Sequence, residues 1–116
     1  MKVKRIVANI PATEVSAAKR FYEEILELDI VMDHGWIVTY GAQAHMLVQI
    51  SFATEGGSGT PVPDLSIEVD ELEVVYNRMK EAGFHITYGP VNEPWGVRRF
   101  FVQDPFGKLV NILSHT

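Results

Sequence analysis

The polar residues best suited to chemistry alternate along one short segment in the second half of the chain. Asp64, Ser66 and Glu68 occupy every second position around the predicted strand 65–69. Because alternate side chains of a strand share a face, we expect these three groups to lie together, opposite Leu65, Ile67 and Val69. Two carboxylates on one face suit a cationic or amine-bearing ligand. Either could also serve as a general base if burial raised its pKa.

The two carboxylates, Asp64 and Glu68, also have purely structural interpretations. Asp64 follows Pro63, a position where strand-entry or turn residues are more common. Glu68 is costly to bury unpaired, so it could pair with Arg98 or Arg99 or lie at a solvated rim.

Amide and aromatic side chains add a second group of candidates. Asn9, Gln49 and Asn111 fall on predicted strands, where they could orient a ligand or simply satisfy one another across the sheets. Gln49 alternates with Leu47 and Ser51. Trp95 is interpreted equally well as a packing plug for its loop or as a platform on which a planar ligand stacks.

Other kinds of chemistry are excluded or disfavoured by the composition and motifs. The chain has no cysteine, which rules out disulfides, thiolate metal sites and cysteine nucleophiles. It has no G-x-S-x-G, P-loop or G-x-G-x-x-G motif. Its four histidines do not show the spacing of a ligand pair.

Length and composition predict one compact domain, and we expect it to lie in the cytoplasm. The chain has 116 residues, 47% of them hydrophobic, and a formal net charge of −5. No basic patch indicates a nucleic-acid partner, and no apolar run is long enough to span a membrane. No signal peptide is visible, and the lack of cysteine fits a reducing compartment.

The order of predicted elements repeats within the chain, which is the strongest indication of its architecture. Each half reads as strand, helix and three strands, and a Gly- and Ser-rich linker separates them. The first half has strands at 3–10, 30–32, 36–40 and 45–52 and a helix at 15–28. The second has strands at 65–69, 84–88, 98–103 and 108–113 and a helix from 70 or 71 to 82. Module 1 is thus about 1–53, the linker about 54–63 and module 2 about 64–116.

The last third of the chain carries the most specific motif. Pro94-Trp95-Gly96-Val97-Arg98 forms a loop, and Asp104-Pro105-Phe106-Gly107 has the residue order of a four-residue turn. In such a turn Asp accepts backbone hydrogen bonds, Pro presets φ, and Gly permits a positive φ. This segment resembles the closing hairpin of the glyoxalase / bleomycin-resistance / dioxygenase family, the vicinal oxygen chelate superfamily.

The resemblance extends over essentially the whole chain and implies a specific α+β fold. Two βαβββ modules would form curved mixed sheets around a cavity, with helices outside. A ferredoxin-like sandwich is the alternative, although it normally has fewer strands. Family members of the bleomycin-resistance type are typically dimers that sequester a ligand.

The resemblance also locates where a metal would bind. Metalloenzymes of the family place His or Glu ligands on four strands, and the matching positions here are Val7, Gln49, Asp64 and Asn111. Only Asp64 is a good ligand for a divalent transition metal. We therefore expect no metal and no other cofactor.

Together these observations favour a metal-free protein that binds a small organic molecule in the cleft of a homodimer. A glyoxalase-like lyase, isomerase or dioxygenase with an altered site is the alternative, with Asp64 or Glu68 as base. A structural or regulatory module with an unused cavity is the third possibility. The candidate ligand contacts are Asn9, Gln49, Asp64, Ser66, Glu68, Trp95, Arg98 and Asn111.

Overall fold

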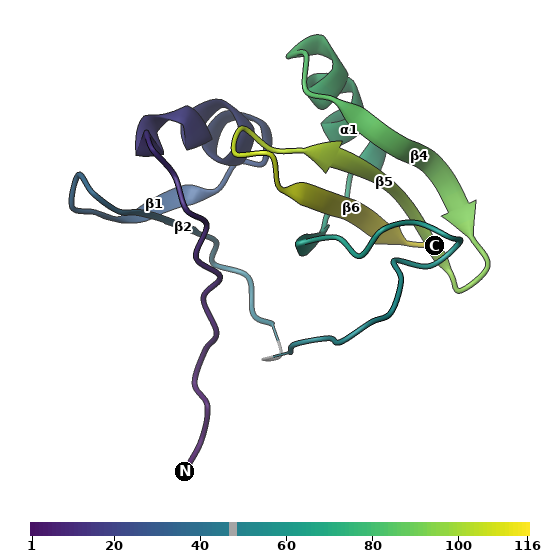
Figure 1. Cartoon of the computed structure of the whole chain (residues 1–116), viewed down its shortest axis with the longest axis horizontal. Coiled ribbons are helices and arrows are strands. Elements are labelled where there is room, and N and C mark those ends of the chain that lie inside the picture. The colour runs from purple at the N-terminus through teal and green to yellow at the C-terminus, as the bar shows by residue number, and fades with distance from the viewer. Residues whose placement is uncertain (47–48) are drawn as a thin grey trace.

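The second half of the chain forms a complete mixed sheet with one helix. The computed structural model describes residues 1–46 and 49–116. The elements of this half are β3 (Leu65–Glu68), α1 (Leu72–Glu81), β4 (Ile86–Glu93), β5 (Val97–Gln103) and β6 (Leu109–His115). The sheet order is β3-β6-β5-β4, with β3 and β6 parallel and the other pairs antiparallel. Figure 1 shows this sheet with α1 behind it. The predicted βαβββ order is confirmed here.

Helix α1 covers one face of the sheet because its apolar residues recur at helical spacing. Leu72, Val75 and Met79 are buried, one to two turns apart. The helix ends at Gly83, whose φ of +83° reverses the chain, and the amide of Phe84 donates to the carbonyl of Met79. The helix and its glycine stop agree with the sequence prediction.

Strand alternation decides which side chains face α1. Phe100, Val102, Val110 and Ile112 belong to the buried core together with the helix. Leu65 and Ile67 of β3 pack against the same core, so Ser66 and Glu68 lie on the other side, as predicted. The face away from α1, called the open face below, carries Arg99, Phe101 and Asn111.

The predicted turn at 104–107 connects β5 to β6 and also fastens the two halves together. One carboxylate oxygen of Asp104 accepts hydrogen bonds from the amides of Phe106 and Lys108, both at 2.8 Å. Gly107 has a φ of +76°. The second oxygen of Asp104 accepts a buried hydrogen bond of 2.7 Å from the Tyr22 hydroxyl, 82 residues earlier in the chain. Burial and this bond raise the pKa of Tyr22.

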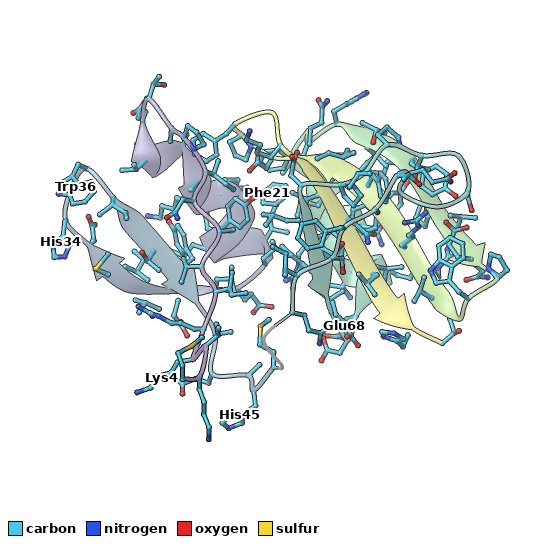
Figure 2. All side chains as sticks on the ribbon, turned by 60° about the horizontal axis from the view of Figure 1, so that its bottom comes forward. Lys4, Phe21, His34, Trp36, His45 and Glu68 are labelled. Atoms are coloured by element: carbon cyan, nitrogen blue, oxygen red, sulfur yellow. The ribbon has the colours of Figure 1, made fainter. Side chains whose placement is uncertain are left out.

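The helix of the first half is shorter and differently wound than predicted. It consists of a 3₁₀ turn, η1 (Val15–Ala18), and a π-helical segment, η2 (Lys19–Ile25), instead of one α-helix over 15–28. It stops early because Glu27 adopts a left-handed φ of +58°, and the amide of Leu28 closes back on the carbonyl of Tyr22. Phe21, labelled in Figure 2, is still part of the buried core. Its ring packs edge-on against Phe84, with 5.1 Å between the ring centroids.

Among the described residues of the first half, two of the four predicted strands form. β1 (Asp29–Asp33) and β2 (Val38–Gly41) make an antiparallel hairpin close to the predicted positions. The predicted strand at 3–10 is wrong for this chain, because residues 1–12 form no strand. The same holds for the described part of 45–52, and the prediction for Leu47 lies outside the described residues.

The segments 1–12 and 45–52 are called the arms below. Among the described residues, neither segment has a neighbouring strand with which it pairs. A strand needs a neighbour to satisfy its backbone groups, so an apolar pattern alone cannot make one. The exposed fractions of Val3, Ile50 and Phe52 are 59%, 68% and 90%. The arms extend from the body in Figure 1, and the radius of gyration is 14.5 Å, against about 13 Å for a compact chain of this length.

Candidate ligand-binding site

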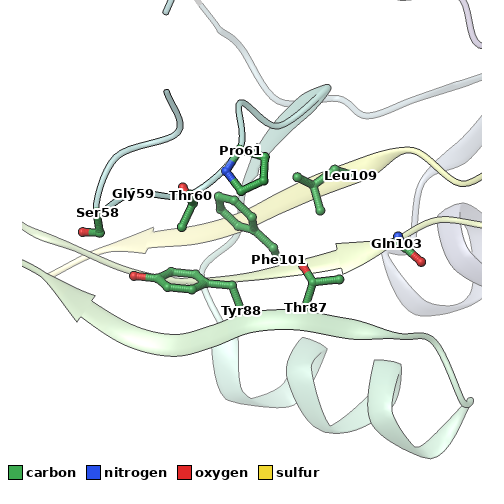
Figure 3. A pocket seen from close by; sticks show the side chains of 9 residues that line it. All are labelled: Ser58, Gly59, Thr60, Pro61, Thr87, Tyr88, Phe101, Gln103 and Leu109. Carbon is green, nitrogen blue, oxygen red and sulfur yellow. The ribbon is translucent and has the colours of Figure 1, made fainter. Parts of the chain in front are cut away.

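A cavity of about 470 Å³ lies between the glycine-rich linker and the open face of the sheet (Figure 3). The linker supplies one side and strands β4, β5 and β6 supply the other. The cavity is lined by Ser58, Gly59, Thr60, Pro61, Thr87, Tyr88, Phe101, Gln103 and Leu109. Aromatic and aliphatic walls with a few hydroxyl and amide groups are typical of small-molecule sites.

An irregularity in β4 brings Tyr88 into this cavity. Ile86 pairs with Val102 while Tyr88 pairs with Phe101, so Thr87 is an extra residue on β4. Without that bulge, Tyr88 would share a face with Ile86 and point toward α1. Gly89 follows, and a Cβ there would lie 2.5 Å from the Arg99 carbonyl oxygen, so only glycine fits.

A buried ion pair lies beside the cavity on the same open face. The guanidinium of Arg99 contacts the Glu93 carboxylate at 2.6 and 2.7 Å, and their side chains are only 4% and 2% exposed. Arg99 also donates to the carbonyls of Gly56 and Gly57 at 2.8 and 3.2 Å. Arg99 therefore ties the linker to the sheet.

The Glu93 carboxylate collects two further hydrogen bonds, both from residues that line the cavity. The hydroxyl of Ser58 donates at 3.0 Å and that of Tyr88 at 3.1 Å. Burial alone would raise the pKa of Glu93. The hydrogen bonds from Arg99, Ser58 and Tyr88 and the positive charge of Arg99 outweigh burial and hold that pKa below its ordinary value.

Three aromatic rings surround the guanidinium. Its carbon lies 5.4, 5.1 and 4.8 Å from the ring centroids of Tyr88, Trp95 and Phe101. Trp95 is 51% exposed and closes over the linker at Gly57. A Cβ at Gly57 would stand 2.8 Å from the indole, and its φ is +88°, so this close approach depends on glycine.

The residues 3–112 match the family described as the Glyoxalase/Bleomycin resistance protein/Dioxygenase superfamily. The chain belongs to this superfamily. A comparison with curated proteins gave no match.

Several solved structures resemble this chain in fold. A member from Sphaerobacter thermophilus DSM 20745 aligns with a TM-score of 0.70 at 20% identity, covering 98% of both chains. TnmS3, an antibiotic binding protein from Streptomyces sp. CB03234, aligns with a TM-score of 0.66 at 23% identity over 92% of this chain and 91% of that one. A glyoxalase/bleomycin resistance protein from the same Streptomyces aligns with a TM-score of 0.59 at 25% identity, over 89% and 93%.

The four sequence candidates on β3, at its entry and on β6 lie in three different places. Asp64 is at strand entry, where its carboxylate accepts the Leu109 amide at 2.8 Å. Ser66 and Asn111 meet on the open face through a 3.1 Å hydrogen bond. Glu68 is exposed and contacts His115 at 3.0 Å.

The remaining sequence candidates are further from the cavity. Arg98 lies on the α1 side, paired with Glu73 at 2.6 Å. Asn9 and Gln49 are exposed on the arms. Trp95 touches the ion pair and the linker but does not line the cavity. The structure thus brings together Ser66 with Asn111, and Trp95 with Arg99.

The superfamily's metal site does not fit these residues. The Val7 side chain has no donor atom, the Asp64 carboxylate accepts the Leu109 amide, and the neutral amides of Gln49 and Asn111 are weak ligands for a divalent transition metal. Among residues 1–46 and 49–116, no three His, Asp or Glu side chains cluster as metal ligands would. Figure 2 shows His34, His45 and Glu68 in separate parts of the molecule.

Sequence reasoning missed Tyr88 and the Glu93–Arg99 pair. The available signal was Gly89-Pro90 directly after the predicted strand 84–88, because glycine and proline beside a strand often mark a bulge. Within the described part of the chain, no helix is long and apolar enough to cross a membrane.

Proposed function

We propose that this protein binds a small organic ligand, without a metal, in the cavity beneath residues 58–61. The observation that carries the proposal is the wall composition: Tyr88 and Phe101 on one side, Pro61 on the other, and hydroxyl groups between them. The cavity volume of about 470 Å³ is in the range of sites for drug-sized molecules.

A related fold supports the binding role. TnmS3 is an antibiotic binding protein, so this architecture can bind a complex organic molecule. At 23% identity the likeness carries over the fold and not the ligand.

The proposal includes a homodimer that completes the cleft. The arms expose apolar side chains that a second copy of the chain can bury, namely Val3, Ile6, Val7, Met46, Ile50 and Phe52. Large apolar side chains left exposed in number are a feature of interaction sites. Asn111 supports a contact at the open face, because its buried Oδ1 has no hydrogen-bond partner among the described residues.

The positions of the carboxylates do not favour the enzyme alternative. A lyase or isomerase needs a base within hydrogen-bond reach of the bound substrate. The Asp64 carboxylate accepts the Leu109 amide at the start of β3. Glu68 is exposed beside His115, and neither residue lines the cavity.

Binding is tested by titrating ¹⁵N-labelled protein with a set of small aromatic fragments and following amide chemical shifts. We expect saturable shifts at residues 58–60, 87–88 and 101–103. Tyr88→Ala should weaken binding at least fivefold, while Trp36→Ala, at the exposed hairpin tip, should not change it. Shifts that are absent, or equal losses in both variants, contradict the proposal.

Catalysis is tested separately. The hemithioacetal of methylglyoxal and glutathione is offered with added Zn²⁺ or Ni²⁺, and elemental analysis is run on protein purified without chelator. We expect no turnover and no stoichiometric metal. Metal-dependent turnover that is lost in Asp64→Asn would overturn the binding-only function.

A further inference from the structure

Two of the hydroxyl groups that line the cavity have already used their hydrogens. Ser58 and Tyr88 both donate to the Glu93 carboxylate. A hydroxyl carries a single hydrogen and two acceptor lone pairs. Toward a ligand, both oxygens therefore offer acceptors only.

The charges beside the cavity are also already matched. Glu93 and Arg99 neutralise each other, and Arg99 also donates to the carbonyls of Gly56 and Gly57. None of the nine lining residues carries a charged side chain. A charged ligand would lose its hydration here without gaining a counter-ion, which is costly.

The walls favour a flat molecule. The rings of Tyr88 and Phe101 lie 5.3 Å apart between centroids, tilted by 57°, and line the sheet side of the cavity. Figure 3 shows the Pro61 ring on the linker side, with Thr60 beside it. Aromatic surfaces of this kind bind planar groups through burial and offset stacking.

Resting on the binding function proposed above, we propose that the ligand is an uncharged, planar aromatic molecule with an O–H or N–H group. That group donates to the oxygen of Ser58 or Tyr88, and the ring system lies between the sheet and the linker. This ligand class differs from the cationic one that the sequence indicated. The difference arises because Asp64 and Glu68 lie outside the cavity, whereas Glu93 is neutralised by Arg99.

The experiment uses four probes that share one ring system. They are 2-naphthol, 2-methoxynaphthalene, 2-naphthoate and 2-naphthylmethylammonium, titrated at pH 7 into the full chain and followed by amide chemical shifts. We expect 2-naphthol to bind at least threefold tighter than its methyl ether, which lacks the donor. It should bind at least tenfold tighter than either ion. A cation or anion that binds as well as 2-naphthol, or an equal affinity for the ether, overturns the inference.

A charge variant tests whether the ion pair sets this preference. Glu93→Gln keeps a similar shape but leaves Arg99 uncompensated, so the affinity for 2-naphthoate should rise at least fivefold relative to 2-naphthol. Glu73→Gln is the matched control, because it neutralises the partner of Arg98 on the opposite face. An unchanged ratio in folded Glu93→Gln, or the same change in both variants, overturns the inference.

The outcomes separate the two proposals. If one of the ions binds best at residues 58–60 and 87–88, the binding function stands and the neutral-ligand inference fails. If none of the four probes shifts those amides, both fail.

Discussion

The sequence predicts the same order of elements for both halves of this chain, yet among the described residues only the second half forms a complete four-stranded sheet. In module 2, β6 lies between β3 and β5, and α1 covers the four strands. In module 1, a helix and the β1–β2 hairpin form, while the described parts of the arms remain exposed. The difference shows that an apolar pattern indicates which segments are able to form a strand. Whether the strand forms depends on a neighbouring strand that pairs with it.

The two halves also differ in where polar groups go. Module 2 buries Glu93 and Arg99 on its open face and uses them to hold the linker that comes from module 1. Module 1 instead leaves its apolar arms exposed. One half buries its polar pair within the chain, and the other leaves apolar side chains exposed on the described parts of the arms.

We expect the largest loss of stability when the buried Glu93–Arg99 ion pair of module 2 is broken. Arg99→Met leaves the Glu93 carboxylate buried without its counter-ion, so we expect the free energy of unfolding to fall by about 3–5 kcal/mol. Arg98→Met is the matched control, since its more exposed pair with Glu73 is worth at most about 1 kcal/mol. Urea unfolding measures both. Equal losses would show that the pair does not distinguish the two faces.

The next effect concerns the arms of module 1. If a second copy covers them, light scattering should give about twice the 13.0 kDa chain mass. Phe52→Asp should weaken the dimer at least tenfold, because burying such a side chain contributes about 1.5–3 kcal/mol. Val74→Asp, at an exposed apolar position of α1, should leave the mass unchanged. A monomer throughout a tenfold concentration series contradicts the dimer.

The bond between the halves should have an intermediate effect. Tyr22→Phe leaves one buried oxygen of Asp104 without its donor, at a cost of about 1–3 kcal/mol of stability. Tyr40→Phe, which keeps the ring stacked on Tyr22, should change stability by less than about 0.5 kcal/mol. Thermal unfolding compares them. A neutral Tyr22→Phe would mean that apolar packing alone joins the modules.

The smallest expected effect is a loss of linker attachment in acid. The folded state lowers the pKa of Glu93 below its ordinary value of 4.5, so the stabilisation is present above that value. It disappears as the pH falls through the lower folded value, when the carboxyl group takes up a proton beside Arg99. Trp95 fluorescence in a Trp36→Phe background should report this change, and Glu93→Gln should abolish it. A flat profile in both proteins contradicts this role for Glu93.

Much of module 2 could be predicted from sequence, because its signals are local. The spacing of Leu72, Val75 and Met79 with Gly83 gave the helix, and Asp104 and Gly107 gave the turn. Alternation around Ser66 assigned the faces of β3. The closing motif also led to the correct superfamily. The site was harder: Ser66 and Asn111 do meet, but Arg98 faces α1 because it is one residue out of phase with Arg99.

The sequence by itself determined which segments favour helix, strand and turn, since those preferences depend on residues within one or two turns of each other. The tertiary structure alone decided the rest. The bulge that turns Tyr88 into the cavity depends on pairing with Phe101, and the Glu93–Arg99 pair holds a linker more than 40 residues away in the chain. The arms follow the same principle: hydrogen bonding and burial between distant segments decide whether a strand forms, and no pattern within the segment supplies that partner.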